Sequence, residues 1–169
     1  MQLGTDFDDF VRVASPGLLR TAFLLCGDRG HAEDMVQTAL LRTARRWSTA
    51  HAQPVAYARR VLVNLAKDRW RDRARRPLEH ESAELELQLE PEDAQIVLRH
   101  TLLPLLMSLP ARQRAVLTLR YLDDLSVEET AAALGCSGGT VKSQTHDALN
   151  RLRTLLAEDT LKEINHADR

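Results

Sequence analysis

Cysteine, aromatic residues and long apolar runs are all scarce in this chain of 169 residues. The only cysteines, Cys26 and Cys136, do not stand at the spacing of a metal-binding motif, so we expect two buried, reduced thiols and no metal site. No stretch approaches the roughly 18 apolar residues that cross a membrane, and the chain does not begin with a basic segment followed by an apolar one. These absences predict a cytoplasmic protein that does not bind a membrane.

Residues that favour β-structure are also few. Aromatic residues make up 4% of the sequence and charged residues 28%, with seven Gly and six Pro spread thinly. This composition is typical of solvated amphipathic helices rather than of sheets. We therefore expect an all-α fold.

The net charge of −1 hides a separation of charge along the chain. Residues 42–76 contain eleven Arg or Lys against two Asp, whereas residues 79–93 contain seven acids and no Arg or Lys. The acidic stretch lacks aromatics and carries isolated leucines, so it cannot bury much surface. This pattern predicts a flexible acidic linker at 78–93.

Helical periodicity divides the rest of the chain around this linker. The first domain, residues 1–77, has apolar-periodic stretches at 6–13 and 17–26 with an interruption at Pro16, then helices near 30–47 and 54–74. The second domain, residues 94–160, has a periodic stretch at 94–107, a helix that opens at Pro110, and two further helices. Residues 161–169 are left as a C-terminal tail.

The last two helices have the spacing of a helix-turn-helix. A short helix at 127–134, a turn at 135–137 and a longer helix from about 139 fit this motif, and Gly135 permits a left-handed turn. The longer helix has an apolar side and a polar side, and its polar side consists of Lys142, Ser143, His146, Asn150 and Arg153. The alternative is a plain helical hairpin with a solvated outer face.

The helix at 54–74 has a basic stripe opposite an apolar face. The predicted apolar face consists of Val55, Ala58, Leu62, Leu65 and Ala66. The stripe consists of Arg60, Asn64, Lys67, Arg71 and Arg75. Arg and Lys attract phosphates whatever the base, and the amide of Asn64 offers the donor and acceptor that can read a base edge. The alternative is a solvated charged face.

An exposed leucine distinguishes the helix before it. Its predicted core side consists of Ala32, Met35, Val36, Ala39, Leu40 and Trp47. Asp34, Gln37 and Leu41 fall together on the outside, which suggests a protein-binding surface, although isolated exposed leucines are common. Trp47 fits a core anchor, whereas Trp70 could pack in the domain or stack on bases.

Together these segments resemble the sigma factors of the extracytoplasmic-function (ECF) class of RNA polymerase, in particular the SigE-like subgroup. AEDMVQTALL resembles the segment that binds the polymerase clamp helices, and PVAYARRVLVNLAKDRWRDRARR resembles the reader of the minus-ten promoter element. LPARQRAVLTLRYLDDLSVEETAAALG, with the helix after it, resembles the minus-thirty-five reader. The resemblance covers nearly the whole chain and implies a sigma region 2-like domain, a linker and a region 4-like helix-turn-helix domain.

The resemblance also implies partners and individual roles. Core RNA polymerase would contact Asp34, Gln37 and Leu41. Minus-ten DNA would contact Arg60, Asn64, Lys67, Arg71 and Arg75, with the loop at 48–54. Minus-thirty-five DNA would contact Thr140, Lys142, Ser143, Gln144, His146, Arg151 and Arg153. An anti-sigma protein is a further implied partner, although no residue here identifies one.

This sequence departs from the family pattern in its last helix. Gln144, His146 and Asp147 stand where relatives often have basic or apolar residues, and an acid beside phosphates is repelled. The departure leaves the preferred minus-thirty-five sequence open.

Two other classes of function fit less of the chain. A helix-turn-helix regulator that binds duplex DNA as a dimer explains the C-terminal module only. A metal-dependent nuclease needs converging carboxylates, and neighbouring acids such as Glu33 and Asp34 lie about 100° apart on a helix. We therefore expect no catalytic activity, no cofactor and no small-molecule substrate.

Overall fold

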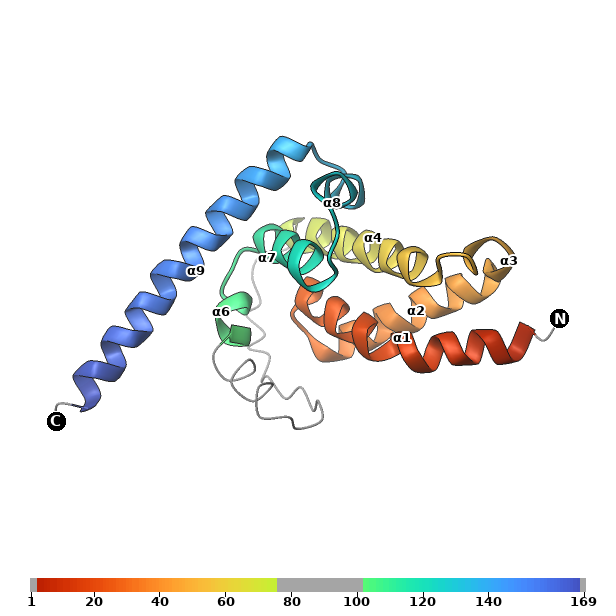
Figure 1. The fold of residues 1–169 in the computed structure, drawn as a ribbon, viewed down its shortest axis with the longest axis horizontal. Helices are drawn as coiled ribbons and strands as arrows, with labels where there is room; N and C mark the ends of the chain where they lie inside the picture. The colour runs from red at the N-terminus through yellow and green to blue at the C-terminus, as the bar shows by residue number, and fades with distance from the viewer. Residues whose placement is uncertain (1–2, 76–101, 168–169) are drawn as a thin grey trace. The chain divides into compact units, whose positions relative to one another are not determined.

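The computed structural model describes residues 3–75 and 102–167, with the side chains of 6–75 and 102–158, and every regular element in these ranges is helical (Figure 1). The all-α prediction is confirmed. The predicted linker at 78–93, and most of the periodic stretch at 94–107, lie outside the described residues.

The chain divides into two compact units. The first contains α1 (Leu3–Cys26), α2 (Arg29–Arg45), α3 (Trp47–Ala50) and α4 (Pro54–Arg75). The second contains α6 (Leu103–Met107), α7 (Ala111–Leu117), the π-helical turn η2 (Thr118–Leu122) and α9 (Gly138–Ala167). Helix α8 (Val127–Leu134) precedes α9 in the chain.

Helix α1 runs without a break through Pro16, so the predicted interruption was wrong. Proline has no N–H and leaves the carbonyl of Arg12 without its helical donor. Both Arg12 and Pro16 are exposed, so water can satisfy this carbonyl. Phe10 and Leu25, which flank the proline, are both buried, so packing holds the two halves in one helix.

Helices α1, α2 and α4 pack against one another and form the core of the first unit. The side chains of Leu25, Leu62 and Val63 are fully buried there. Val55 is 39% exposed, so its predicted place on the apolar face was wrong, because it stands in the first turn of α4, before the buried stretch.

Both tryptophans belong to this packing. Trp47 begins α3 rather than ending α2, and its ring lies 5.1 Å from that of Phe7 and 5.5 Å from that of Phe10, between ring centroids. The indole N–H of Trp70 donates a hydrogen bond to the carbonyl of Leu25 at 3.0 Å. This carbonyl stands in the last turn of α1, where helical donors have run out. The structure thus gives Trp70 a packing role.

The turn between α1 and α2 is fixed by its first two residues. Gly27 has a φ of 78°, which glycine adopts without strain. Asp28 is the N-cap of α2, and its carboxylate accepts a hydrogen bond from the backbone N–H of His31 at 2.7 Å. That bond, followed by the His31 ring and the charge of Arg69, lowers the pKa of Asp28, and burial opposes it only in part.

We expect Asp28→Ala to destabilise the chain by about 1 kcal/mol at pH 7, the usual value of an N-cap. A carboxyl whose folded pKa is lowered stabilises the protein above its unfolded pKa and loses this contribution as the pH falls. The stabilities of the wild type and the variant should therefore begin to converge as the pH falls through about 4, the usual pKa of an unfolded Asp, and should approach each other further below it. Urea unfolding from pH 7 to pH 3 measures this, and a difference that stays constant would contradict the assignment.

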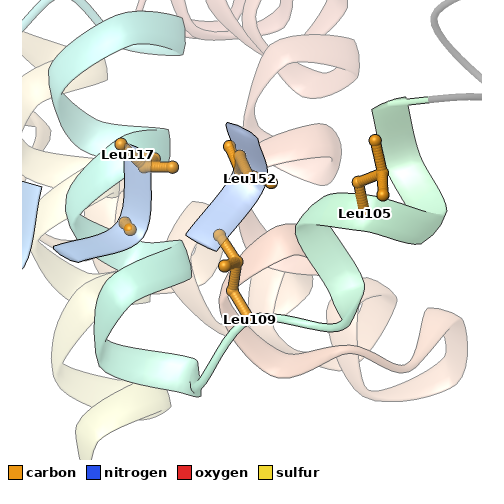
Figure 2. Close-up of a cluster of buried hydrophobic side chains, with 5 residues drawn as sticks. Leu105, Leu109, Leu117 and Leu152 are labelled. Atoms are coloured by element: carbon orange, nitrogen blue, oxygen red, sulfur yellow. The ribbon is translucent and has the colours of Figure 1, made fainter. Parts of the chain in front are cut away.

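The second unit is held by a leucine cluster. Leu105 of α6, Leu109, Leu117 of α7 and Leu152 of α9 meet there with Ala148 (Figure 2). Arg114 is buried beside them and donates to the carbonyl of Leu109 at 3.1 Å. These contacts anchor the buried side of α9 and leave its other side exposed.

The predicted helix-turn-helix elements are present. The hydroxyl of Ser126 accepts from the N–H of Glu129 at 3.0 Å, and the Glu129 carboxylate accepts from the N–H of Ser126 at 2.8 Å, a capping box that starts α8. Gly135 has a φ of 68°, as the turn requires. The hydroxyl of Ser137 accepts from the N–H of Thr140 at 3.1 Å and caps α9. Helix α9 continues to Ala167, into the residues predicted as a tail.

Candidate polymerase and nucleic-acid interfaces

The first candidate surface lies on the outer face of α2. Asp34, Gln37 and Leu41 are all exposed, and the Leu41 side chain is 59% exposed. The opposite side of the helix, with Met35, Val36 and Ala39, is buried. The exposed face predicted from the sequence is therefore present. It carries an apolar side chain in solvent, on a helix whose opposite side packs in the core.

The second candidate surface is the stripe of α4. Arg60, Asn64, Arg71 and Arg75 are exposed as predicted, whereas Lys67 is half-buried. The opposite side of α4 packs in the core of the first unit. Its fully buried residues are Ala58, Leu62, Val63 and Ala66.

One acid also borders this stripe. Arg71 forms an exposed ion pair with Asp68, one turn before it. Asp68 is one of the two acids among the eleven Arg or Lys of residues 42–76, and its spacing of three residues from Arg71 was the signal for this pair in the sequence. A phosphate must therefore compete with Asp68 for Arg71.

Arg69 is half-buried and bonds within the first unit rather than forming part of the stripe. Its guanidinium lies 3.0 Å from Nδ1 of His31, which itself lies 2.5 Å from the Asp28 carboxylate. One ring nitrogen cannot donate and accept at once, so we assign Nδ1–H as the donor to the carboxylate. Arg69 then contributes its charge to this cluster, which ties α4 to the start of α2.

The third candidate surface is the exposed side of α9. Thr140, Lys142, Ser143 and His146 are exposed, and so are Arg151 and Arg153 one to two turns later. Gln144 is half-buried. Val141 and Ala148 are fully buried on the opposite side. This packing fixes the orientation of α9 about its axis and keeps its polar face in solvent.

Asn150 joins two of the predicted residues on this surface, although the sequence argument gave it no role in binding. Its amide nitrogen lies 2.9 Å from Nε2 of His146, and its amide oxygen accepts from Nη1 of Arg153 at 3.1 Å. The spacings of four and three residues place the three side chains in a row along one face.

Other kinds of site find little support in the described ranges. No group of three or more His, Cys, Asp or Glu there could hold a metal ion. Cys26 is buried, but Cys136 is only half-buried, which corrects the prediction of two buried thiols, because Cys136 lies in the open turn before α9. None of the helices in residues 3–75 and 102–167 combines the length and the apolarity of a membrane span.

Comparison with known proteins identifies the family. Residues 10–76 match the family described as Sigma-70 region 2, and residues 105–154 match Sigma-70, region 4. The chain is 41% identical over 157 residues to the RNA polymerase sigma-E factor of Streptomyces coelicolor, covering 91% of this chain and 88% of the relative. It is 33% identical over 173 residues to the ECF RNA polymerase sigma factor SigE of Mycolicibacterium smegmatis, covering 95% of this chain and 65% of that relative. The chain belongs to the ECF sigma factors.

Solved structures agree with this assignment. The fold of this ECF sigma factor is similar to that of the sigma factor RpoE of Bartonella quintana, solved in complex with the anti-sigma factor NepR. The TM-score is 0.68 at 28% identity, over 90% of this chain and 97% of that one. A structure of CnrH with the cytosolic domain of CnrY shares the fold, with a TM-score of 0.62 at 20% identity over 90% of this chain and 88% of that one.

Membership in the family confirms two of the predicted partners, core RNA polymerase and promoter DNA. The ECF sigma factors bind core RNA polymerase and promoter DNA, and they act in transcription initiation.

Proposed function

We propose that this sigma factor binds core RNA polymerase through Asp34, Gln37 and Leu41 of α2 and reads the promoter through α4 and α9. The observation that supports this most is that three separate helices each present an exposed functional face opposite a buried one. An exposed leucine flanked by polar groups suits a protein partner, whereas two polar or basic faces suit DNA.

The stripe of α4, with residues 48–54 before it, would hold the minus-ten strand. Turning a base out of a duplex costs a few kcal/mol, so contacts with the extruded strand must offset it. Arg60, Lys67 and Arg71 supply charge for phosphates, and the exposed amide of Asn64 can pair with a base edge.

The polar face of α9 would enter the minus-thirty-five major groove. In a helix-turn-helix the start of the second helix contacts base edges, which gives this role to Thr140, Ser143, Gln144 and His146. Lys142 would face the groove with them, and the two arginines farther along, Arg151 and Arg153, would contact phosphates.

The remaining assignments follow from this arrangement. Residues 1–77 would bind polymerase and minus-ten DNA, residues 94–160 would bind minus-thirty-five DNA, and 78–93 would link them. The chain would act by binding alone, without catalysis, cofactor or small-molecule substrate, in the cytoplasm. An anti-sigma protein would control it, and the proposal is supported by the sigma factor RpoE of Bartonella quintana, which was solved in complex with the anti-sigma factor NepR.

Reconstituted transcription tests the proposal. The purified chain is added to core polymerase with fragmented genomic DNA, and the transcripts are mapped. Defined start sites that depend on the chain are expected. A folded chain that binds duplex DNA but neither binds core polymerase nor starts transcripts would instead be a stand-alone helix-turn-helix regulator.

We expect Asp147→Arg to tighten binding to minus-thirty-five DNA and to steepen its salt dependence. Asp147 is exposed beside His146, near the proposed phosphate contacts, and its charge repels the backbone. One added phosphate contact should raise the slope of log K against log salt by about 0.9.

Glu158→Arg is the matched control for this variant. Glu158 is also exposed, and it lies three helical turns farther along the same side of α9, about 16 Å away and beyond the Debye length at physiological salt. The control should therefore change the slope little. An unchanged slope in Asp147→Arg would show that Asp147 points away from the DNA backbone.

A further inference from the structure

The row formed by His146, Asn150 and Arg153 fixes the position of a proton on the exposed side of α9. A guanidinium only donates hydrogen bonds, so the Asn150 group that faces Arg153 must be its carbonyl oxygen. The Asn150 NH₂ group then faces Nε2 of His146 as a donor. Nε2 must therefore accept, which requires a neutral ring that carries its proton on Nδ1.

The reverse orientation of the amide is disfavoured for the same reason. It would bring the NH₂ group against Nη1 of Arg153, so that two donors would face each other at 3.1 Å. Arg153 thus selects the orientation of Asn150, and Asn150 selects the tautomer of His146.

We propose that Asn150 is a positioning residue that makes His146 a hydrogen-bond donor toward DNA, so that this position of the minus-thirty-five element favours a base with an acceptor edge over cytosine. The inference rests on the proposed role of α9 in reading the promoter. In the major groove guanine presents N7 and O6, adenine N7 and thymine O4 as acceptors, whereas cytosine presents only an N4 donor. An Nδ1–H group can bond to the first three bases and faces another donor at the fourth.

Asn150 would also hold Arg153 for its phosphate contact. The bond to the Asn150 oxygen uses one of the five N–H groups of the guanidinium, so the others remain available for a phosphate. Asn150 itself needs no contact with DNA in this scheme, and its loss should alter selectivity through its neighbours.

The tautomer can be measured in the full-length chain. Ring ¹⁵N shifts of His146 at pH 8 should show the proton on Nδ1 in the wild type. In Asn150→Ala the ring should move toward the Nε2–H form, and in Asn150→Asp the carboxylate, which only accepts, should place a proton on Nε2. Thr154→Ala is the control, because Thr154 is exposed on the same helix and its hydroxyl bonds only to the backbone carbonyl of Asn150. An Nε2–H ring in the wild type, or an unchanged ring in Asn150→Ala, would overturn the proposal.

Promoter selection tests the consequence. The holoenzyme is assembled and the minus-thirty-five element of a mapped promoter is randomised one position at a time. At one position the wild type should disfavour cytosine by about fivefold, the usual value of one hydrogen bond. His146→Ala and Asn150→Ala should both lose most of this preference, and Thr154→Ala should keep it.

The outcomes separate this inference from the proposed function. A wild-type chain that starts no transcripts with core polymerase overturns the sigma assignment and the DNA reading with it. A chain that transcribes normally but keeps the same base preference in Asn150→Ala overturns only the role of Asn150.

Discussion

Exchanging Asp34 and Gln37 for alanine should lower the affinity of the chain for core RNA polymerase by about 10- to 100-fold, as expected when two central contacts of an interface are truncated. Both side chains are exposed on α2, while the buried side of that helix stays unchanged, so the free chain should remain folded. The loss should appear mainly as faster dissociation, since contact residues affect the off-rate more than the on-rate. Titration of core polymerase into the labelled chain measures both.

The exposed pair Asp9 and Arg12 on α1 offers a matched control. These residues also stand three apart on a helix, and their ion pair is exposed, so removing both should cost little stability and leave polymerase binding unchanged. Leu41→Ala should weaken binding by itself, because the leucine is 59% exposed in the free chain and gains by burial in a partner. Equal affinities for the control and the Asp34→Ala, Gln37→Ala variant would place the polymerase surface elsewhere.

Helical periodicity was enough to predict most of this fold and the orientation of its faces. Buried Val141, Ala148 and Leu152 on α9 recur on one side of a helix, so the polar side followed from spacing alone. The same argument placed Asp34, Gln37 and Leu41 together on α2, because their direction around the helix axis follows once the buried side of the helix is known. The roles of these residues came from the family resemblance, since exposure does not name a partner.

Periodicity did not predict the outcome at positions where tertiary packing overrides a local preference of the residue. Pro16 disfavours a helix by itself, yet α1 continues because Phe10 and Leu25 are buried on either side and Pro16 faces water. Val55 has the residue type of a core position, but it stands before the part of α4 that is covered. Such outcomes depend on which segments cover which others, and a single sequence does not give this information.

Side-chain pairs on exposed faces were also beyond the sequence argument. Asp68 with Arg71, and Asn150 with its two neighbours, have helical spacings that permit contact, but many pairs along these helices have such spacings. The rotamers decide which pairs form. The exposed faces could therefore be predicted from the sequence, whereas the side-chain pairs within each face are known only from the structure.

Removing Arg60, Lys67 and Arg71 together should weaken binding of the holoenzyme to single-stranded minus-ten DNA by about 100-fold and lower the salt slope by about 2, as expected for three phosphate contacts on a single strand. The three side chains lie on one face of α4, so a single strand can follow them. Asp68→Ala should have the opposite effect, because it frees Arg71 from its ion pair at little cost in stability. Asn64→Ala should leave the salt slope unchanged and reduce the preference between bases.

A matched triple variant separates contacts made by the stripe from the loss of positive charge alone. Arg12, Arg20 and Arg73 are exposed and lie outside the stripe, with Arg73 on the other side of α4, so changing them to alanine removes the same charge. These arginines lie away from the proposed strand, and distant exposed charges are screened. Their loss should therefore weaken binding far less than loss of the stripe residues does, and should change the salt slope little. Binding to an oligonucleotide from a mapped promoter, measured between 50 and 200 mM salt, compares the two triple variants. Equal losses would mean that the stripe contributes general electrostatic attraction, and the minus-ten strand would then follow another path over the domain.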